Sequence, residues 1–187
     1  MKKFLLCVIL TVCITGVSLF AWEAQDLTKF PPSMDGKTWI FNLGVGFSLP
    51  DAYFGQNNYI WIPPIRLSFD KNTPIGAKNL PFFFGGLVGY SGYGFTDGWF
   101  LHRITAGVRA GYHFNFNVEN LDVYAVTTAG WTFYAGNGRP TGLDSFGIPS
   151  FGVNLGGRWF VSKGFGFWAE AGYSSYSFIE LGLAFKF

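Results

Sequence analysis

The sequence predicts an all-β protein, an eight-stranded antiparallel up-and-down β-barrel that crosses a membrane and has short turns at one end. Three observations predict this fold class. Apolar residues recur at every second position in a series of separate segments, the composition is poor in charge and rich in aromatic residues, and the chain begins like an exported protein. After residue 21 no apolar run approaches the ~18 residues of a membrane helix, so strands are left to cross the bilayer.

The composition favours lipid as the solvent of this chain. At 187 residues there is room for about one domain. Charged residues make up 13% of the sequence, compared with about 25% in an average soluble domain. Aromatic residues reach 21%, with 23 Phe, 9 Tyr and 7 Trp. A water-soluble domain of this composition would be hard to keep monomeric.

The first 21 residues have the pattern of a signal peptide. Lys2 and Lys3 form a basic start, the apolar stretch FLLCVILTVCITGV follows, and cleavage is expected after Ala21. Removing the two lysines leaves 11 of the 13 basic residues against 11 acidic ones, so the mature chain has no net charge. Such a balance offers no basic patch, and no nucleic-acid partner is expected.

Both cysteines, Cys7 and Cys13, lie within this expected signal peptide. The mature chain would then contain no thiol, which excludes a disulfide, thiol catalysis and a cysteine-ligated metal. Cys13 could alternatively carry a lipid anchor, although Val12 is a poor match to the small residue expected before such a cysteine.

The first four expected strands are Lys37–Leu49, Tyr59–Asp70, Phe82–Tyr90 and Phe100–Phe114. Alternation is strong in three of them, whereas Phe82–Tyr90 is rich in glycine and less regular. In the second strand, an unbroken alternation places Tyr59, Trp61 and Pro63 on the same face as Ile65. The fourth is the most regular, and its apolar face consists of Ile104, Ala106, Val108, Ala110, Tyr112 and Phe114.

The last four expected strands are Leu121–Tyr134, Phe151–Val161, Phe165–Ser174 and Phe178–Phe187. Stretches rich in Gly, Asn, Pro and Ser separate the segments and read as turns. Connections of this length favour antiparallel neighbours, and an even number of strands returns the chain to its starting side. A membrane-spanning strand needs about 9–11 residues, which the expected strands provide.

The two faces of these strands indicate which one meets lipid. The less apolar face carries mainly Gly, Ser, Thr and Asn, whereas the exterior of a soluble, lipocalin-like barrel would need many charges. Aromatic residues gather toward the strand ends of the apolar face, where membrane barrels have aromatic girdles. An arginine facing lipid at the bilayer centre costs about 2–4 kcal/mol. We therefore expect all four strand arginines to point inward, namely Arg66, Arg103, Arg109 and Arg158.

An eight-stranded barrel is just wide enough for its own side chains to fill it. The expected inward ionisable residues are Arg66, Asp70, Arg103, Arg109, His113, Asp122, Arg158, Glu170, Glu180 and Lys186. The candidate lumen network consists of Arg66, Arg103, Arg109, Arg158, Glu170 and Glu180. Within it, the hairpin spacing places Arg158 opposite Glu170 and predicts an ion pair or a shared network. Two interpretations stay open: a packed, ion-paired plug, or a narrow porin-like channel for small solutes.

Glycines on the inner face fit either interpretation of the lumen. They could leave room for a solute, or they could make room for the bulky side chains Trp168, Tyr124, Phe160 and Phe178.

The last segment, FIELGLAFKF, alternates apolar residues and finishes on a phenylalanine. This ending resembles the C-terminal signature of outer-membrane proteins of Gram-negative-type bacteria, with Phe185 and Phe187 at its aromatic positions. Together with the signal peptide and the eight strands, it resembles the small barrels of the OmpX, OmpA-transmembrane and OmpW type. In that family the last strand is read by the outer-membrane assembly machinery, so the resemblance implies that Phe185 and Phe187 form an assembly signal.

The resemblance also implies a location and a domain layout. Residues 1–21 would be the signal peptide, 22–36 a periplasmic N-terminal segment and 37–187 the transmembrane barrel, with short turns and both termini in the periplasm. The expected location is the outer membrane, with outer-membrane lipid as a partner. Host or extracellular ligands would bind through the outer loops, of which Ala135–Ile148 is the longest.

The candidates for catalysis are few. His102 lies on the lipid-facing phase, as does the histidine of outer-membrane lipid A deacylases. In those enzymes a serine follows two residues later, whereas this chain has Ile104. His113 faces inward without an obvious Ser–acid pair, and no spacing suggests zinc or another cofactor. We therefore expect a non-enzymatic protein with a structural or surface-interaction role, or alternatively a narrow channel.

Overall fold

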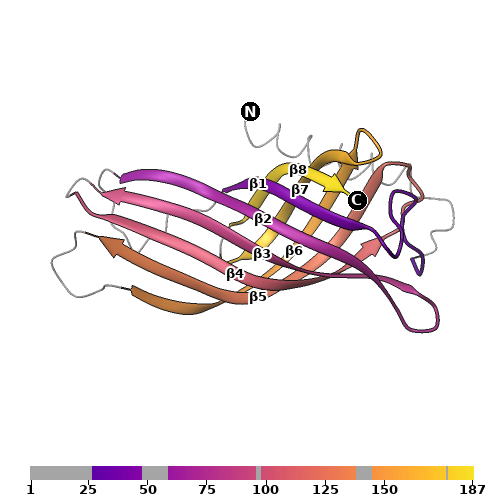
Figure 1. Cartoon of the computed structure of the whole chain (residues 1–187), viewed down its shortest axis with the longest axis horizontal. Helices are drawn as coiled ribbons and strands as arrows, with labels where there is room; N and C mark the ends of the chain where they lie inside the picture. Colours follow the sequence, from indigo (N-terminus) through magenta and orange to yellow (C-terminus); the bar gives the residue numbers. More distant parts are fainter. Residues whose placement is uncertain (1–26, 48–58, 96–97, 138–144, 176) are drawn as a thin grey trace, which may run out of the picture.

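The computed structural model describes residues 27–47, 59–95, 98–137, 145–175 and 177–187. The expected signal peptide and the first residues of the 22–36 segment lie outside these ranges. The described residues form one closed antiparallel barrel with strand order β1 to β8 (Figure 1). Its strands are β1 (Trp39–Phe47), β2 (Tyr59–Ile75), β3 (Leu80–Phe95), β4 (Phe100–Phe114), β5 (Leu121–Asn137), β6 (Ser145–Phe160), β7 (Phe165–Ser174) and β8 (Ile179–Lys186). The predicted eight-stranded all-β fold is thereby confirmed.

The barrel closes between its first and last strands. β1 pairs with β8 in a register that sets Phe41 opposite Phe185 and Leu43 opposite Leu183. Beyond the last pair, the amide of Trp39 donates to the carbonyl of Phe187 at 3.0 Å and the amide of Phe187 donates back at 2.9 Å. Closure satisfies backbone groups that would otherwise form an open strand edge in lipid.

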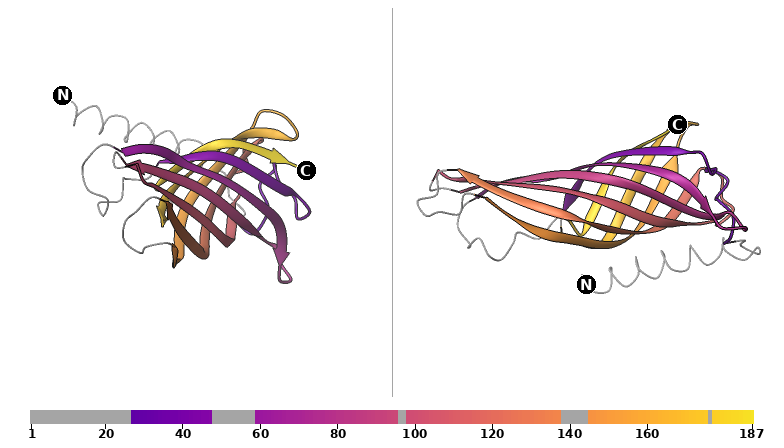
Figure 2. Two further views of the ribbon diagram at one scale, coloured as in Figure 1. Left: turned by 60° about the vertical axis from the view of Figure 1, so that its left-hand side comes forward. Right: turned by 60° about the horizontal axis from the view of Figure 1, so that its bottom comes forward.

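Five strands are longer than a bilayer requires. β2 to β6 have 15 to 17 residues, whereas β1, β7 and β8 have 8 to 10. The long strands run past the short ones, most clearly at the end of the barrel where β1 finishes (Figures 1 and 2). We call this end the Phe47 end and the opposite one, where β1 begins, the Trp39 end. Of the loop expected at Ala135–Ile148, residues 135–137 and 145–148 belong to β5 and β6, and residues 138–144 lie outside the described ranges.

The unbroken alternation expected in β2 is wrong. Ile62 pairs with Gly92 and Ile65 pairs with Tyr90, so β2 has one more residue than β3 between these two pairs. The extra residue is a β-bulge at Pro63–Pro64, which shifts the phase of the pairing. The physical reason is local, since proline has no amide hydrogen to donate to the sheet and is found at bulges.

The outer face of the barrel is apolar and the inner face is polar. Val108 and Leu155 point outward and are 67% and 65% exposed, although a water-soluble protein would bury such side chains. Charged residues of the same strands, such as Arg109 and Arg158, are buried inside. This inversion of a soluble protein is the arrangement of a transmembrane barrel. In the described part of the chain, no helix has the length and apolarity needed to cross a membrane.

Residues 27–38 lie across the Trp39 end of the barrel (Figure 2). Met34 is buried in a cluster with Ile40, Phe160, Trp168 and Ala184, which come from β1, β6, β7 and β8. Polar contacts hold the same segment to three strands. Its Ser33 Oγ donates to the carbonyl of Leu121 in β5 at 3.0 Å. Two of its carbonyls accept hydrogen bonds, that of Asp35 from Asn72 Nδ2 in β2 at 2.6 Å and that of Ser33 from Lys186 Nζ in β8 at 2.8 Å. The segment, which we call the end plug, therefore lies across this mouth of the barrel with the Met34 side chain packed inside it.

Candidate functional site

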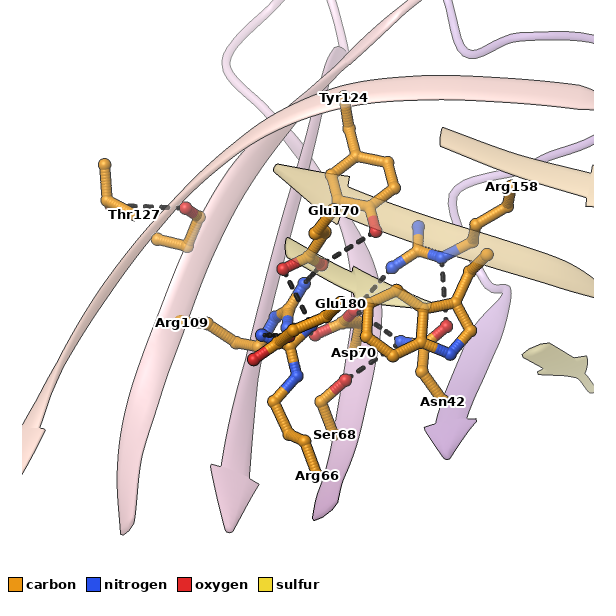
Figure 3. Close-up of polar contacts among 12 residues, drawn as sticks. Asn42, Arg66, Ser68, Asp70, Arg109, Tyr124, Thr127, Arg158, Glu170 and Glu180 are labelled. Carbon is orange, nitrogen blue, oxygen red and sulfur yellow. Dashed lines mark hydrogen bonds and ion pairs between the residues drawn. The ribbon is translucent and has the colours of Figure 1, made fainter. Parts of the chain in front are cut away.

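The candidate site is a network of charged side chains in the barrel interior (Figure 3). Each strand points every second side chain inward, and closure brings these inward positions to one narrow lumen. Arginines come from β2, β4 and β6, and carboxylates from β2, β5, β7 and β8. Every side chain in these ion pairs is at most 3% exposed.

Glu170 of β7 is the acceptor at the centre of the first group. Its Oε2 accepts a hydrogen bond from Arg66 Nη2 at 2.7 Å, and its Oε1 accepts one from Arg109 Nη2 at 2.7 Å. The hydroxyl of Tyr124 donates to Oε1 at 2.8 Å. Arg66 also forms an ion pair with Glu180, which in turn accepts a hydrogen bond from Ser177 Oγ. The Glu170 carboxylate thus has three donors from three strands.

Asp70 of β2 joins two further arginines. Arg109 Nε lies 2.8 Å from its Oδ1 and Arg158 Nη2 lies 2.7 Å from its Oδ2. Asn42 supports this group through both ends of its side-chain amide. Its Nδ2 donates to Ser68 Oγ at 3.0 Å and to Asp70 Oδ2 at 3.3 Å. Its Oδ1 accepts a hydrogen bond from Arg158 Nε at 3.2 Å. Asp70 therefore connects the arginines of β4 and β6.

The network continues toward the Trp39 end through Asp122. Its Oδ2 accepts from Arg158 Nη1 at 2.7 Å, and its Oδ1 lies 2.6 Å from His113 Nδ1. The other ring nitrogen of His113 lies 3.0 Å from Asn72 Oδ1, and Asn72 Nδ2 donates to the carbonyl of Asp35 in the end plug. A continuous chain of polar contacts thus runs from Glu180 to the end plug.

Aromatic rings fill the space between the charges. The Arg158 guanidinium lies 4.0 Å above the ring centre of Tyr124. A Cβ added at Gly156 would lie 2.4 Å from Tyr124, and one at Gly44 would lie 2.7 Å from Trp168. These glycines make room for aromatic side chains and not for a solute. A hollow beside Arg66 has a volume of only about 20 Å³, roughly the space of one water molecule.

The structure places the six predicted network residues inside the barrel but does not bring them into one cluster. Arg103 lies apart from the ion pairs described above, with Nη1 3.3 Å from the hydroxyl of Tyr93 and Nη2 2.8 Å from the carbonyl of Ser175. Arg158 and Glu170 make no direct contact, because the register sets Arg158 opposite Trp168 and Gly156 opposite Glu170. They share a network through Arg109 and Asp70.

Sequence reasoning left several members out of the network. Asp70, Asp122 and His113 were expected to face inward but were not assigned to it, although each forms one of its contacts. Asn42 and Tyr124 were missed as polar partners. The one feature of the sequence that could have identified them is their inward-facing position in the alternation of β1 and β5. Phe178 was expected to fill the interior but is 41% exposed. It precedes the first residue of β8, so the strand alternation does not fix its side.

The two residues of the expected assembly signal lie at the seam of the barrel. The ring of Phe185 lies 5.5 Å from that of Phe165 and 6.2 Å from that of Phe41, between centroids. Phe187 is exposed, and its backbone pairs with Trp39. The catalytic candidate His102 lies on the outer face, with Nδ1 3.0 Å from the hydroxyl of Tyr90.

No protein-family model and no curated protein matches the sequence. Among solved structures, the N-terminal β-barrel domain of Pseudomonas aeruginosa OprF matches with a TM-score of 0.50 and 13% identity, over 82% of this chain and 98% of that one. Ail, the attachment invasion locus protein of Yersinia pestis, matches with a TM-score of 0.51 and 15% identity, over 82% of this chain and 100% of that one. At these identities the likeness concerns the fold. The chain therefore has the fold of the small eight-stranded outer-membrane β-barrels that its sequence resembles.

Proposed function

We propose that the protein is an integral outer-membrane barrel with a closed, ion-paired interior and a structural or surface-interaction role. The observation that carries this proposal is the network of buried arginines and carboxylates that joins strands on opposite sides of the lumen. An ion pair in a dry interior is costly to break, because removing one partner leaves an uncompensated charge. A lumen held in this way does not open without disrupting several contacts at once.

The alternative, a narrow porin-like channel, has less support in the geometry. A water-filled channel needs a continuous path, whereas the described interior contains a ~20 Å³ hollow, rings packed against glycines and the end plug across one mouth. Conductance through a planar bilayer separates the two functions.

We also propose that the protein is not an enzyme. The interior carboxylates already accept hydrogen bonds from arginines, whereas a catalytic acid or base must reach the reacting atoms. Outside the barrel, His102 contacts Tyr90, and the residue two positions later is Ile104 and not a nucleophile.

The proposed location is supported by the apolar outer face, by the fold and by the resemblance of the C-terminal segment to an outer-membrane signature. The test is fractionation of expressing cells. The protein should appear in the outer membrane and require detergent for extraction. Recovery as a soluble periplasmic monomer would contradict the proposal.

The proposed partners are outer-membrane lipid, the outer-membrane assembly machinery and external ligands bound by the loops. For the assembly machinery, the proposal rests on Phe185 and Phe187. Deletion of Phe187 should lower the folded yield in cells more than Phe178→Ala, which removes an exposed aromatic side chain just before the first residue of the same strand. Equal folded yields of the two variants would argue against an assembly signal.

A further inference from the structure

All six lysines that follow the expected signal peptide lie at the Trp39 end of the barrel. They come from the end plug, from the adjoining ends of β2 and β8, and from two turns. These residues are Lys29, Lys37, Lys71, Lys78, Lys163 and Lys186. In the end plug and the three turns of this end, which the structure describes in full, the acidic side chains are Asp35 and Glu119, so the four lysines of these segments outnumber them.

Three of these lysines surround a hollow of about 550 Å³ beside the seam of β1 and β8. Lys37, Lys163 and Lys186 line it together with Trp39 and Phe187. Trp39 and Phe187 point to the outside of the barrel, where large aromatic side chains mark the boundary between lipid and water. The hollow is therefore placed where the phosphate groups of a leaflet would lie.

The charged groups that line the hollow differ in how many contacts they already make within the protein. Lys186 Nζ donates to the carbonyl of Ser33 and lies 4.4 Å above the ring centre of Phe160, so it is part of the barrel wall. Asp35 is turned into its own loop, where the amide of Lys37 and the hydroxyl of Thr38 donate to its Oδ1 at 2.8 Å each. These hydrogen bonds, that of the Lys37 amide first, hold the pKa of Asp35 below its usual range. Lys37 and Lys163 are exposed, so their ammonium groups supply positive charge that faces the hollow's solvent side.

We propose that this hollow binds the phosphate group of an anionic phospholipid, held between Lys37 and Lys163, with the acyl chains lying along the outer face of β1 and β8. Charge complementarity supports a lipid with a net negative headgroup, and the apolar outer face continues directly from the hollow through Trp39 and Phe187. The inference goes beyond the proposed function. It depends on insertion into lipid but not on whether the lumen conducts or on the cellular location.

The direct test is native mass spectrometry of the purified, detergent-solubilised protein with equimolar dioleoylphosphatidylglycerol and dioleoylphosphatidylcholine. The wild-type protein should retain phosphatidylglycerol in preference to phosphatidylcholine. Each lysine near an anionic surface contributes roughly fivefold in affinity, so Lys163→Ala should lower the preference about fivefold and the double variant Lys37→Ala/Lys163→Ala should lower it further. Circular dichroism and heat-dependent gel mobility check that each variant is folded.

Matched controls remove the same charge from the same end of the barrel. Lys78 and Lys163 both lie in turns at this end, but Lys163, in the β6–β7 turn, lines the hollow and Lys78, in the β2–β3 turn, does not. Lys78→Ala is therefore the control. This variant should retain the preference of the wild type.

An equal loss in Lys78→Ala and Lys163→Ala would overturn the proposal in favour of diffuse attraction by the whole end. Equal retention of both lipids by the wild type would also overturn it. So would release of phosphatidylglycerol by an equimolar amount of inorganic phosphate, which would indicate a site for the free anion. If the double variant does not fold, the comparison of Lys163→Ala with Lys78→Ala keeps the proposal testable, because both residues are exposed in turns.

Discussion

Arg66 on β2 and Glu170 on β7 meet inside the barrel, with 2.7 Å between Nη2 of the arginine and Oε2 of the glutamate. Two strands, β1 and β8, lie between them in the wall, so the contact does not follow the hydrogen-bonded ladder of the sheet. It crosses the interior and occupies space that a passing solute would need. The same carboxylate holds Arg109 of β4, which extends the connection to a third strand.

The energetic importance of this contact can be measured by a double-mutant cycle. Glu170→Ala should lower the free energy of unfolding by about 3–5 kcal/mol, because Arg66 and Arg109 lose a buried partner. The coupling energy of Arg66→Ala with Glu170→Ala should be clearly larger than that of Arg158→Ala with Glu170→Ala, since Arg66 contacts Glu170 directly whereas Arg158 pairs with Asp70 and Asp122. Urea unfolding in detergent micelles gives both quantities.

Glu119→Ala is the control for removal of a carboxylate, because Glu119 is exposed in the β4–β5 turn. Its effect should stay within about 0.5 kcal/mol. A loss of less than 1 kcal/mol for Glu170→Ala, as for solvated ion pairs, would show that water reaches the network.

Two adjacent glycines of β6 test whether aromatic rings fill the lumen. Gly156→Ala should destabilise the barrel by about 1–3 kcal/mol, because the new Cβ would lie 2.4 Å from a Tyr124 ring that Arg158 and Glu170 hold in place. Gly157→Ala is the matched control, since its Cβ would approach only the carbonyl of Asp122, at 3.8 Å. Unfolding of both variants under one condition measures the difference. Equal stabilities would mean that the interior has spare volume beside Tyr124.

The packing of the end plug against the barrel should depend on one buried methionine. Met34→Ala removes most of a side chain packed against Ile40, Phe160 and Trp168, which should cost about 2–5 kcal/mol and loosen residues 27–38. Amide hydrogen exchange of this segment should rise in Met34→Ala and stay near the wild-type level in Met34→Leu, which conserves volume. Unchanged protection in Met34→Ala would show that polar contacts alone hold the segment.

The fold was largely predictable because period-2 alternation identifies both the strands and the face that meets lipid. Strand ends were less predictable, since β2 to β6 continue through the expected turns wherever a neighbour supplies hydrogen bonds. The bulge at Pro63–Pro64 breaks the alternation locally, although proline gave a hint of it. The end plug carries no periodic pattern, so its contacts with Asn72 and Lys186 had no signal in the sequence.

The ion pairs show where sequence reasoning stops. Alternation assigned the charged residues to the interior, but pairing depends on the stagger between strands and on which side chains meet across the lumen. A register two residues different from the expected one separates Arg158 from Glu170. Arg66 and Glu170 are 104 residues apart and lie on strands that are not neighbours, so no local spacing relates them.

Single-channel recording in planar bilayers tests the closed interior most directly. The folded wild-type protein, inserted from detergent at a level confirmed by recovery from the membrane, should give no discrete conductance steps above the bare bilayer. Glu170→Ala should be recorded beside it, because loss of the carboxylate that holds Arg66 and Arg109 is the change expected to loosen the lumen. Stable, discrete conductance steps from the folded wild-type protein would contradict a closed interior and establish the channel.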